Sequence, residues 1–160
     1  MWALTQPVDK RLFRCPYDDV ELLGKAVTGS GTDGWHPIGL IMHLQNGAVF
    51  GAVYANVAPS MPLPRALRGP ALALGEHLAS WPLTVLSDRF HPARDELPRL
   101  HGNRAAFWQA AWRHLLFGAV LGELERRLGD GGPPDAPEPE ATYSSNGHGS
   151  LEHAVSAKAS

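Results

Sequence analysis

The stretch from Asn103 to Leu128, NRAAFWQAAWRHLLFGAVLGELERRL, is the most strongly patterned part of the chain. Asn103 is a good helix N-cap, because its side chain can accept hydrogen bonds from the unpaired amides of a first turn. Gly129 would end the helix at a position where glycine is favoured. Small residues and one histidine recur every four positions and form a narrow ridge, made of Ala110, His114, Gly118 and Gly122. Such a ridge lets another helix backbone approach closely, so we expect this helix to be packed against.

A similar ridge occurs earlier, at Gly39, His43, Gly47, Gly51 and Ala55. The five residues GAVFG at 47–51 resemble GAVLG at 118–122, and in both places a histidine stands four residues before the first glycine. Short matches of this kind arise either from an internal duplication or by chance in sequence rich in Ala and Gly, and both readings stay open.

A third helix is expected between Leu63 or Pro70 and Trp81, with small residues at Ala71, Gly75 and Ala79. Pro82 should kink or break it, because proline removes one amide and crowds the preceding turn. The fold predicted is therefore all-α: a compact bundle of three long helices with Gly/Ala packing ridges and a short N-terminal helical segment. The ridge positions expected to pack against helices are Gly39, Gly47, Gly51, Gly75, Gly118 and Gly122.

Three regions are expected along the chain. Residues 1–33 form an N-terminal flap with a short helix capped by Asp18 or Asp19, and residues 34–128 form the helical bundle. Residues 129–160 lack a hydrophobic period and are rich in Gly, Pro, Ser and Ala, so they are predicted to be a disordered tail.

Composition excludes several functions. The net charge of −2 and the lack of a basic stripe interleaved with aromatics argue against a nucleic-acid partner. Cys15 is the only cysteine, which rules out an intrachain disulfide. No phosphate-binding loop and no catalytic motif is found, so neither an enzymatic activity nor a bound cofactor is expected.

The segment from Gly34 to Pro64 contains no Asp, Glu, Lys or Arg. Within it, Ile38 to Ala58 is long enough to cross a bilayer, which takes about 20 apolar residues. The later two helices are nearly uncharged, with Glu76 and Arg113 as their internal charges. A lipid bilayer is thus the expected partner, through as many as three spans, and a soluble cytoplasmic bundle is the alternative.

Basic residues set the expected orientation. They are more numerous on the N-terminal side of the three predicted spans, which would place the N-terminus in the cytoplasm of a cell-membrane protein. The residues counted on that side are Lys10, Arg11, Arg14, Lys25, Arg89, Arg94, Arg99 and Arg104.

One group of polar residues could form an interior site. Each long helix carries a histidine, and the group consists of His43, Glu76, His77 and His114. Imidazoles and a carboxylate on facing helices can bind zinc or iron, yet no His-Glu-x-x-His or Glu-x-x-His spacing is present. An ordinary buried hydrogen bond is the expectation for each histidine, and a soluble protein with a His/Glu metal or small-ligand site is the alternative function.

The chain resembles a group of small helical proteins of high-GC Gram-positive bacteria for which no activity is established. The resemblance is carried by EHL at 76–78, WPL at 81–83, SDR at 87–89, HPAR at 91–94, WRHLLFG at 112–118 and LGELER at 121–126. It spans about residues 2–128, and the spaced Gly and His residues are more distantly similar to a bacterial inner-membrane group. The resemblance implies helices and a membrane location, and it assigns no reaction or site. We therefore expect a protein that acts by helix packing, with a second copy of itself or with another helical protein.

Overall fold

The computed structural model describes the backbone of residues 2–130 and the side chains of residues 6–128, and within that range every regular element is helical. The predicted all-α fold class is therefore confirmed. The elements are α1 (Trp2–Phe13), α2 (Asp19–Thr28), α3 (Trp35–Val57), the 3₁₀ turn η1 (Ala58–Ser60), α4 (Arg65–Ser80), the 3₁₀ turn η2 (Trp81–Leu83), α5 (Thr84–Phe90) and α6 (Arg104–Asp130).

The predicted tail lies outside the described residues, except for its first two. Gly129 and Asp130 belong to α6, which continues two residues beyond the predicted end at Leu128. Residues 2–130 belong to one compact unit.

Local signals account for three of the helix ends. Asn103 caps α6, its side-chain oxygen accepting from the amides of Ala105 and Ala106 at 3.1 and 3.2 Å. Asp18 caps α2 in the same way, accepting from Val20 and Glu21. Pro82 follows the end of α4 at Ser80, and the chain continues as η2 and then α5 instead of one straight helix.

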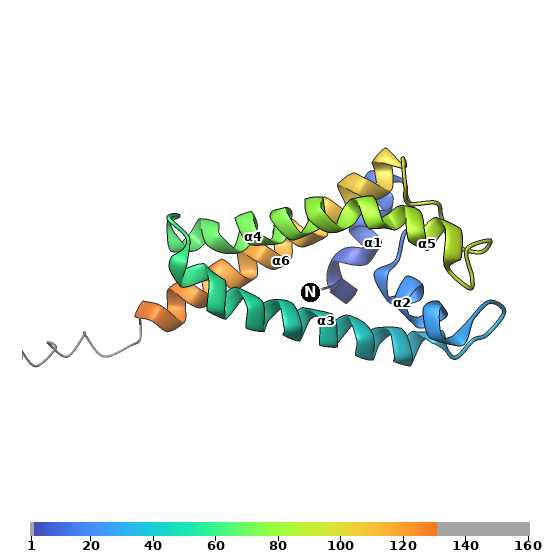
Figure 1. The fold of residues 1–160 in the computed structure, drawn as a ribbon, viewed down its shortest axis with the longest axis horizontal. Coiled ribbons are helices and arrows are strands. Elements are labelled where there is room, and N and C mark those ends of the chain that lie inside the picture. Colours follow the sequence, from blue (N-terminus) through green and yellow to red (C-terminus); the bar gives the residue numbers. More distant parts are fainter. Residues whose placement is uncertain (1, 131–160) are drawn as a thin grey trace, which may run out of the picture. The chain divides into compact units, whose positions relative to one another are not determined.

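α4 and α6 form the tightest pair, and they run antiparallel side by side (Figure 1). Gly69 of α4 and Gly118 of α6 face each other so closely that a Cβ on either would lie within 3.0 Å of the other's carbonyl oxygen. A Cβ at Gly122 would lie 2.9 Å from the Ala66 carbonyl. Pro70 has no amide to bond that carbonyl, which is four residues before it in α4. The ridge on α6 thus receives the α4 backbone.

α2 and α3 form a second close pair. A Cβ at Gly24 would meet the Trp35 carbonyl, and one at Gly39 would meet the Val20 carbonyl. This pairing covers one side of the N-terminal half of α3. Figure 1 shows α3 nearest to the α4–α6 pair at its C-terminal end, where the chain turns through η1 into α4, and farther from that pair at its N-terminal end.

Polar contacts fasten α1 and α2 to α6. The Arg113 guanidinium binds Asp9 of α1 at 2.6 and 2.9 Å and Asp19 of α2 at 2.7 Å. Gln109 donates to the same Asp9 carboxylate at 2.9 Å, and Asp9 is fully buried. The bundle end that holds both short helices is therefore organised around one buried carboxylate.

Candidate functional site

Three of the four predicted polar residues come together between α4 and α6. Glu76 and His77 lie on α4, and His114 lies on α6. The Nε2 atom of His114 lies 2.8 Å from a Glu76 carboxylate oxygen, and its Nδ1 lies 2.8 Å from the Ala110 carbonyl oxygen. The ring of His77 lies 4.9 Å from that of His114, centroid to centroid.

His77 is enclosed mainly by aromatic side chains. Its ring centroid lies 4.8 Å from Phe107 and 5.3 Å from Trp81, and the residue is 1% exposed. Its Nε2 has no hydrogen-bond partner among the described residues. The site therefore places the buried His77 ring, whose Nε2 lacks a partner among the described residues, beside the His114 ring, which is hydrogen-bonded at both nitrogens.

The pKa values of the two histidines are shifted in opposite directions. Burial lowers the pKa of His77, and the neighbouring His114 charge lowers it further. Burial alone would lower the pKa of His114 too, but the hydrogen bonds to Glu76 and Ala110 raise it above its ordinary value. The bond from His114 in turn lowers the pKa of Glu76. The arrangement favours the charged form of His114 beside Glu76 on the partly exposed side and the neutral form of His77 on the buried side.

This geometry does not suit a metal ion. A neutral ligand nitrogen is needed for coordination, yet both nitrogens of His114 are already committed. His43 lies on α3, and no group of three or more His, Cys, Asp or Glu among the described residues is arranged to hold a metal. The alternative of a His/Glu metal site therefore gains no support from the arrangement.

The predicted ridge glycines divide into two groups. Gly39, Gly118 and Gly122 lie at close helix approaches. A Cβ at Gly47, Gly51 or Gly75 would meet no atom within 4 Å, so these three lie at no close approach inside the described chain. Gly24 and Gly69 do lie at such approaches and were not among the predicted positions. The sequence does indicate Gly69, because Gly69, Ala73 and His77 are spaced by four and form a second ridge beside that of Ala71, Gly75 and Ala79.

α3 carries the most unusual surface of the molecule. Of its 23 residues only Gly39 and Tyr54 are buried, although the helix carries no charge of the Asp, Glu, Lys or Arg type. Exposed fractions reach 64% at Ile41 and 63% at Leu44, and further large side chains are exposed at Val49, Val53 and Val57. We call the set Ile41, Leu44, Val49, Val53 and Val57 the α3 apolar surface.

The contacts that α3 does make are near its two ends. α2 covers the N-terminal half. Towards the C-terminal end, Phe50 meets Phe117 at 5.6 Å between ring centroids, and the Tyr54 hydroxyl hydrogen-bonds Glu125. Glu125 is itself bound to Arg68 at 2.8 Å. α3 is thus attached to the fold at both ends, while its outer side faces away from it.

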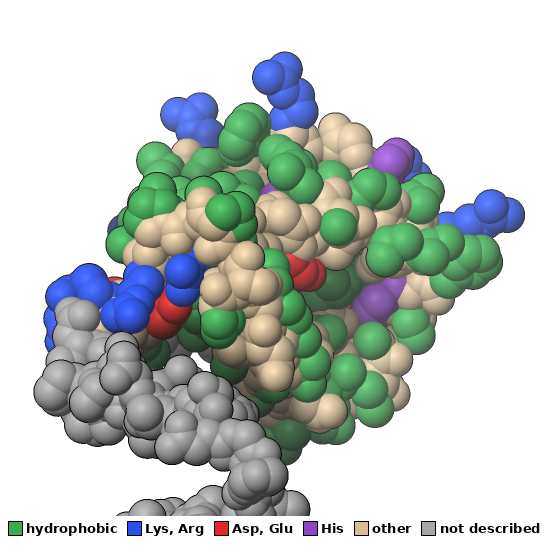
Figure 2. Space-filling view, turned by 60° about the vertical axis from the view of Figure 1, so that its left-hand side comes forward, with side chains coloured by type: hydrophobic (Ala, Val, Ile, Leu, Met, Phe, Trp, Pro, Cys, Tyr) green, Lys and Arg blue, Asp and Glu red, His purple; other side chains and the backbone are tan. Residues whose placement is uncertain are grey.

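Only one of the three predicted spans has the length and apolar character for a membrane. Within the described residues, Trp35–Ser60 is the single candidate, and 11% of its most apolar window is buried. Figure 2 shows hydrophobic side chains over much of the surface in view, with few acidic groups between them.

Comparison of the chain with known protein families, with characterised proteins and with solved structures finds no match. The function must therefore be argued from the arrangement of this chain's own residues.

Proposed function

We propose that the protein is a membrane-associated helical protein that attaches to a lipid bilayer through the α3 apolar surface. The observation that carries this proposal is a 23-residue helix without Asp, Glu, Lys or Arg whose outer side is left open. Each large aliphatic side chain that is fully removed from water contributes about 1.5–3 kcal/mol. Covering the five partly exposed residues of this surface would contribute several kcal/mol, which is enough to drive attachment.

A bilayer fits this surface better than a single helical partner does. At 100° per residue, the exposed positions between Ile41 and Val57 span roughly two thirds of the helix circumference, and Gln45, Asn46 and Asn56 lie among the aliphatic residues of this arc. One neighbouring helix covers a stripe of only about 100°. A bilayer surface can cover this arc, with acyl chains against its outer part and lipid headgroups against its edges, whereas a protein partner would need several elements to do so.

The attachment of both ends of α3 favours an orientation in the plane of the membrane. α2 and the Tyr54–Glu125 bond hold the two ends to the same folded body, which carries the buried Asp9–Arg113 ion pair. The helix could cross a bilayer only if that body crossed with it. An in-plane helix keeps the body on one side, and its apolar outer side then reaches the boundary between headgroups and acyl chains.

In this proposal the three long helices α3, α4 and α6 act as one packing unit. The ridge of Gly118 and Gly122 fixes α4 on α6, and Phe50 and Tyr54 connect that pair to α3. We place the folded body on the cytoplasmic face of the cell membrane, where anionic lipids attract basic residues.

The test is fractionation of cells after an alkaline carbonate wash. The wild-type protein should stay in the membrane pellet and dissolve only in detergent. The variant Ile41→Lys/Leu44→Lys/Val49→Lys should appear in the wash, because each lysine places a charge where acyl chains are expected, at a cost of up to about 3 kcal/mol.

The matched control is Val8→Lys/Leu12→Lys/Leu78→Lys. These three side chains are 64%, 65% and 60% exposed, as open as the α3 positions, but they lie on α1 and α4. The control should remain in the pellet. Release of the wild-type protein into the wash would overturn the proposal. So would failure of the purified protein to float with protein-free lipid vesicles, which would point to a protein partner instead.

A further inference from the structure

The segment that joins α5 to α6 is rich in arginine. Between residues 89 and 104 it carries Arg89, Arg94, Arg99 and Arg104, and all four side chains are exposed. We call residues 89–104 the arginine loop. The loop is fixed at its start and end, because Asp88 of α5 accepts hydrogen bonds from the amides of Leu100 and His101 at 2.9 and 2.8 Å.

The acidic groups near these arginines are mostly committed elsewhere. Both oxygens of Asp88 bond backbone amides. Glu96 binds Lys25 at 2.8 Å and the Gly31 amide at 2.9 Å, and the bond to Lys25 keeps its pKa below the ordinary value. Asp95 has a 94% exposed side chain and approaches Arg94 only to 3.8 Å. Among the described residues, the arginines of the loop have no ion pair closer than the 3.8 Å between Arg94 and Asp95, and Arg94 also donates to the Arg89 carbonyl at 3.1 Å.

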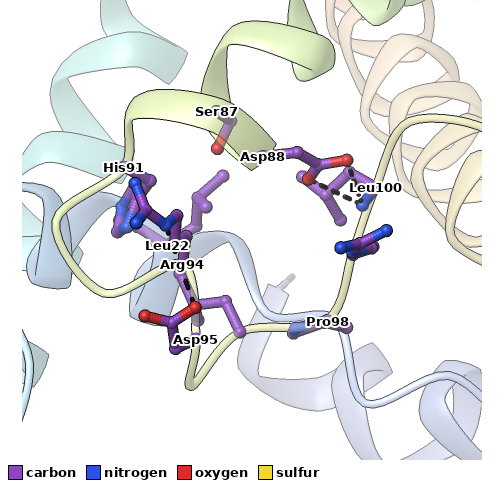
Figure 3. A pocket seen from close by; sticks show the side chains of 10 residues that line it. Leu22, Ser87, Asp88, His91, Arg94, Asp95, Pro98 and Leu100 are labelled. Carbon is purple, nitrogen blue, oxygen red and sulfur yellow. Dashed lines mark hydrogen bonds and ion pairs between the residues drawn. The ribbon is translucent and has the colours of Figure 1, made fainter.

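A cavity of about 110 Å³ lies within the loop (Figure 3). A single water needs only about 10–15 Å³ of such space, so the cavity has room for a tetrahedral oxyanion. Ser87, Arg94 and Arg99 line it and can donate hydrogen bonds to an anion. Two carboxylates also line it: both oxygens of Asp88 accept hydrogen bonds from backbone amides, and the Asp95 side chain is 94% exposed and free to turn towards solvent. His91 also lines the cavity, and its Nδ1 accepts from the Ala93 amide while its Nε2 donates to the Leu22 carbonyl. His91 thus shapes the cavity without adding a free donor.

Hydrogen bonds hold the arginine loop near the start of α3. His91 and Glu96 fasten it to α2 and to the turn at Gly31 that precedes α3. α2 in turn packs on the N-terminal half of α3. If α3 lies among the acyl chains, a loop held beside its first turn stands at the level of the lipid phosphates.

We propose that the arginine loop binds the phosphate group of an anionic phospholipid in this cavity. The inference rests on the proposed membrane attachment and adds the lipid class to it. The planar guanidinium forms two parallel hydrogen bonds with a phosphate, and a basic segment at an anionic membrane surface is attracted through each arginine. The bilayer is favoured over a soluble phosphate because the loop is fixed beside the apolar helix.

The test compares flotation of the full-length protein with vesicles of phosphatidylcholine alone and with vesicles that also contain phosphatidylglycerol. Wild-type protein should bind the anionic vesicles more tightly. Arg94→Gln/Arg99→Gln should lose roughly thirty-fold in affinity for the anionic vesicles while keeping its binding to the neutral ones. The control Arg11→Gln/Arg127→Gln removes the same charge at exposed sites outside the loop and should change the affinity less than about three-fold.

Other results separate the possible failures. An equal loss in both double variants would overturn the site, because only net charge would then matter. Arg94→Lys/Arg99→Lys keeps the charge but not the paired hydrogen bonds, and it should fall between wild type and the Gln variant. Binding of inorganic phosphate at millimolar concentration, lost in the Gln variant, together with equal binding of the wild type to neutral and anionic vesicles, would show a soluble ligand and contradict the lipid assignment. If the wild-type protein did not bind neutral vesicles at all, that result would instead refute the attachment through α3.

Discussion

At the scale of single residues, the fold depends on a few buried polar groups and on glycines that allow backbones to touch. Asp9 is completely buried and is neutralised by Arg113, whose own pKa would be lowered by burial but is raised by the bonds to Asp9 and Asp19. A buried charge that loses its partner is strongly destabilising, whereas an exposed ion pair contributes little.

The buried pair gives a direct stability prediction. Arg113→Met leaves the Asp9 carboxylate buried without its cation and should lower the free energy of unfolding by about 3–5 kcal/mol, measured by urea denaturation. Arg127→Met removes an exposed arginine that binds Glu123 at 2.7 Å, and it should cost no more than about 1 kcal/mol. Similar losses in the two variants would show that the Asp9–Arg113 pair does not organise the fold.

A matched pair of glycine variants tests the helix contacts. Gly118→Ala places a Cβ against the Gly69 carbonyl and should destabilise by about 1–3 kcal/mol in thermal unfolding. Gly47→Ala meets no atom within 4 Å and should stabilise by about 0.4–1 kcal/mol, because alanine restricts the unfolded chain. A destabilised Gly47→Ala would mean that Gly47 packs against another molecule.

The His114–Glu76 pair predicts a pH dependence. The pKa of His114 is higher in the folded state than the ordinary 6.5, so the folded protein binds the proton more tightly. Stability should therefore increase as the pH falls from above that raised pKa to about 6.5, and the gain should disappear in Glu76→Gln. Glu123→Gln is the control, since a carboxyl whose pKa is about 2 does not titrate in this range.

His77 acts in the opposite sense at lower pH. Its pKa is lowered in the fold, so protonation favours the unfolded chain and stability should fall as the pH drops below about 6.5. The two histidines together predict a maximum of stability at mildly acidic pH in equilibrium unfolding. A profile that rises continuously from pH 5 to 8 would contradict the assignment of His114 as the protonated ring.

At the scale of the elements, the sequence predicts some features well because they depend on neighbouring residues. The cap at Asn103, the cap at Asp18 and the break at Pro82 are local and occur as expected. The small-residue ridges show which helix faces are smooth but not which partner they meet. Gly47 and Gly118 have the same pattern, yet only Gly118 meets another backbone inside the described chain.

Contacts between distant elements could not be predicted from periodicity. Arg113 and Asp9 are 104 positions apart, and nothing in the spacing of either residue indicates the other. The meeting of His77 and His114 also follows from the α4–α6 register, which Gly69 and Gly118 set. The cavity of the arginine loop also could not be predicted, because it depends on Asp88 holding Leu100 and His101 back against α5.

At the scale of the whole molecule, the central feature is a folded body with one long uncharged helix on its outside. The body has its own buried polar network and its own helix pair, so it does not need α3 to hide its charges. Leaving this helix open to water would be costly, because a contiguous set of exposed large aliphatic side chains is normally covered by protein or lipid. The proposed covering is a bilayer, with the arginine loop at its phosphate layer.

The measurement that tests this account most directly is a scan of single labelled cysteines along α3 in vesicles. Cys15→Ser would provide the background, and a fluorescent label would be placed in turn at residues 41, 44, 48, 49, 52 and 53. If α3 lies in the membrane plane, quenchers attached to the acyl chains should quench all these labels at a similar shallow depth. Aqueous quenchers should not reach the labels. A depth that changes steadily from residue 41 to residue 53 would show a crossing helix, and quenching from water at every position would contradict membrane attachment altogether.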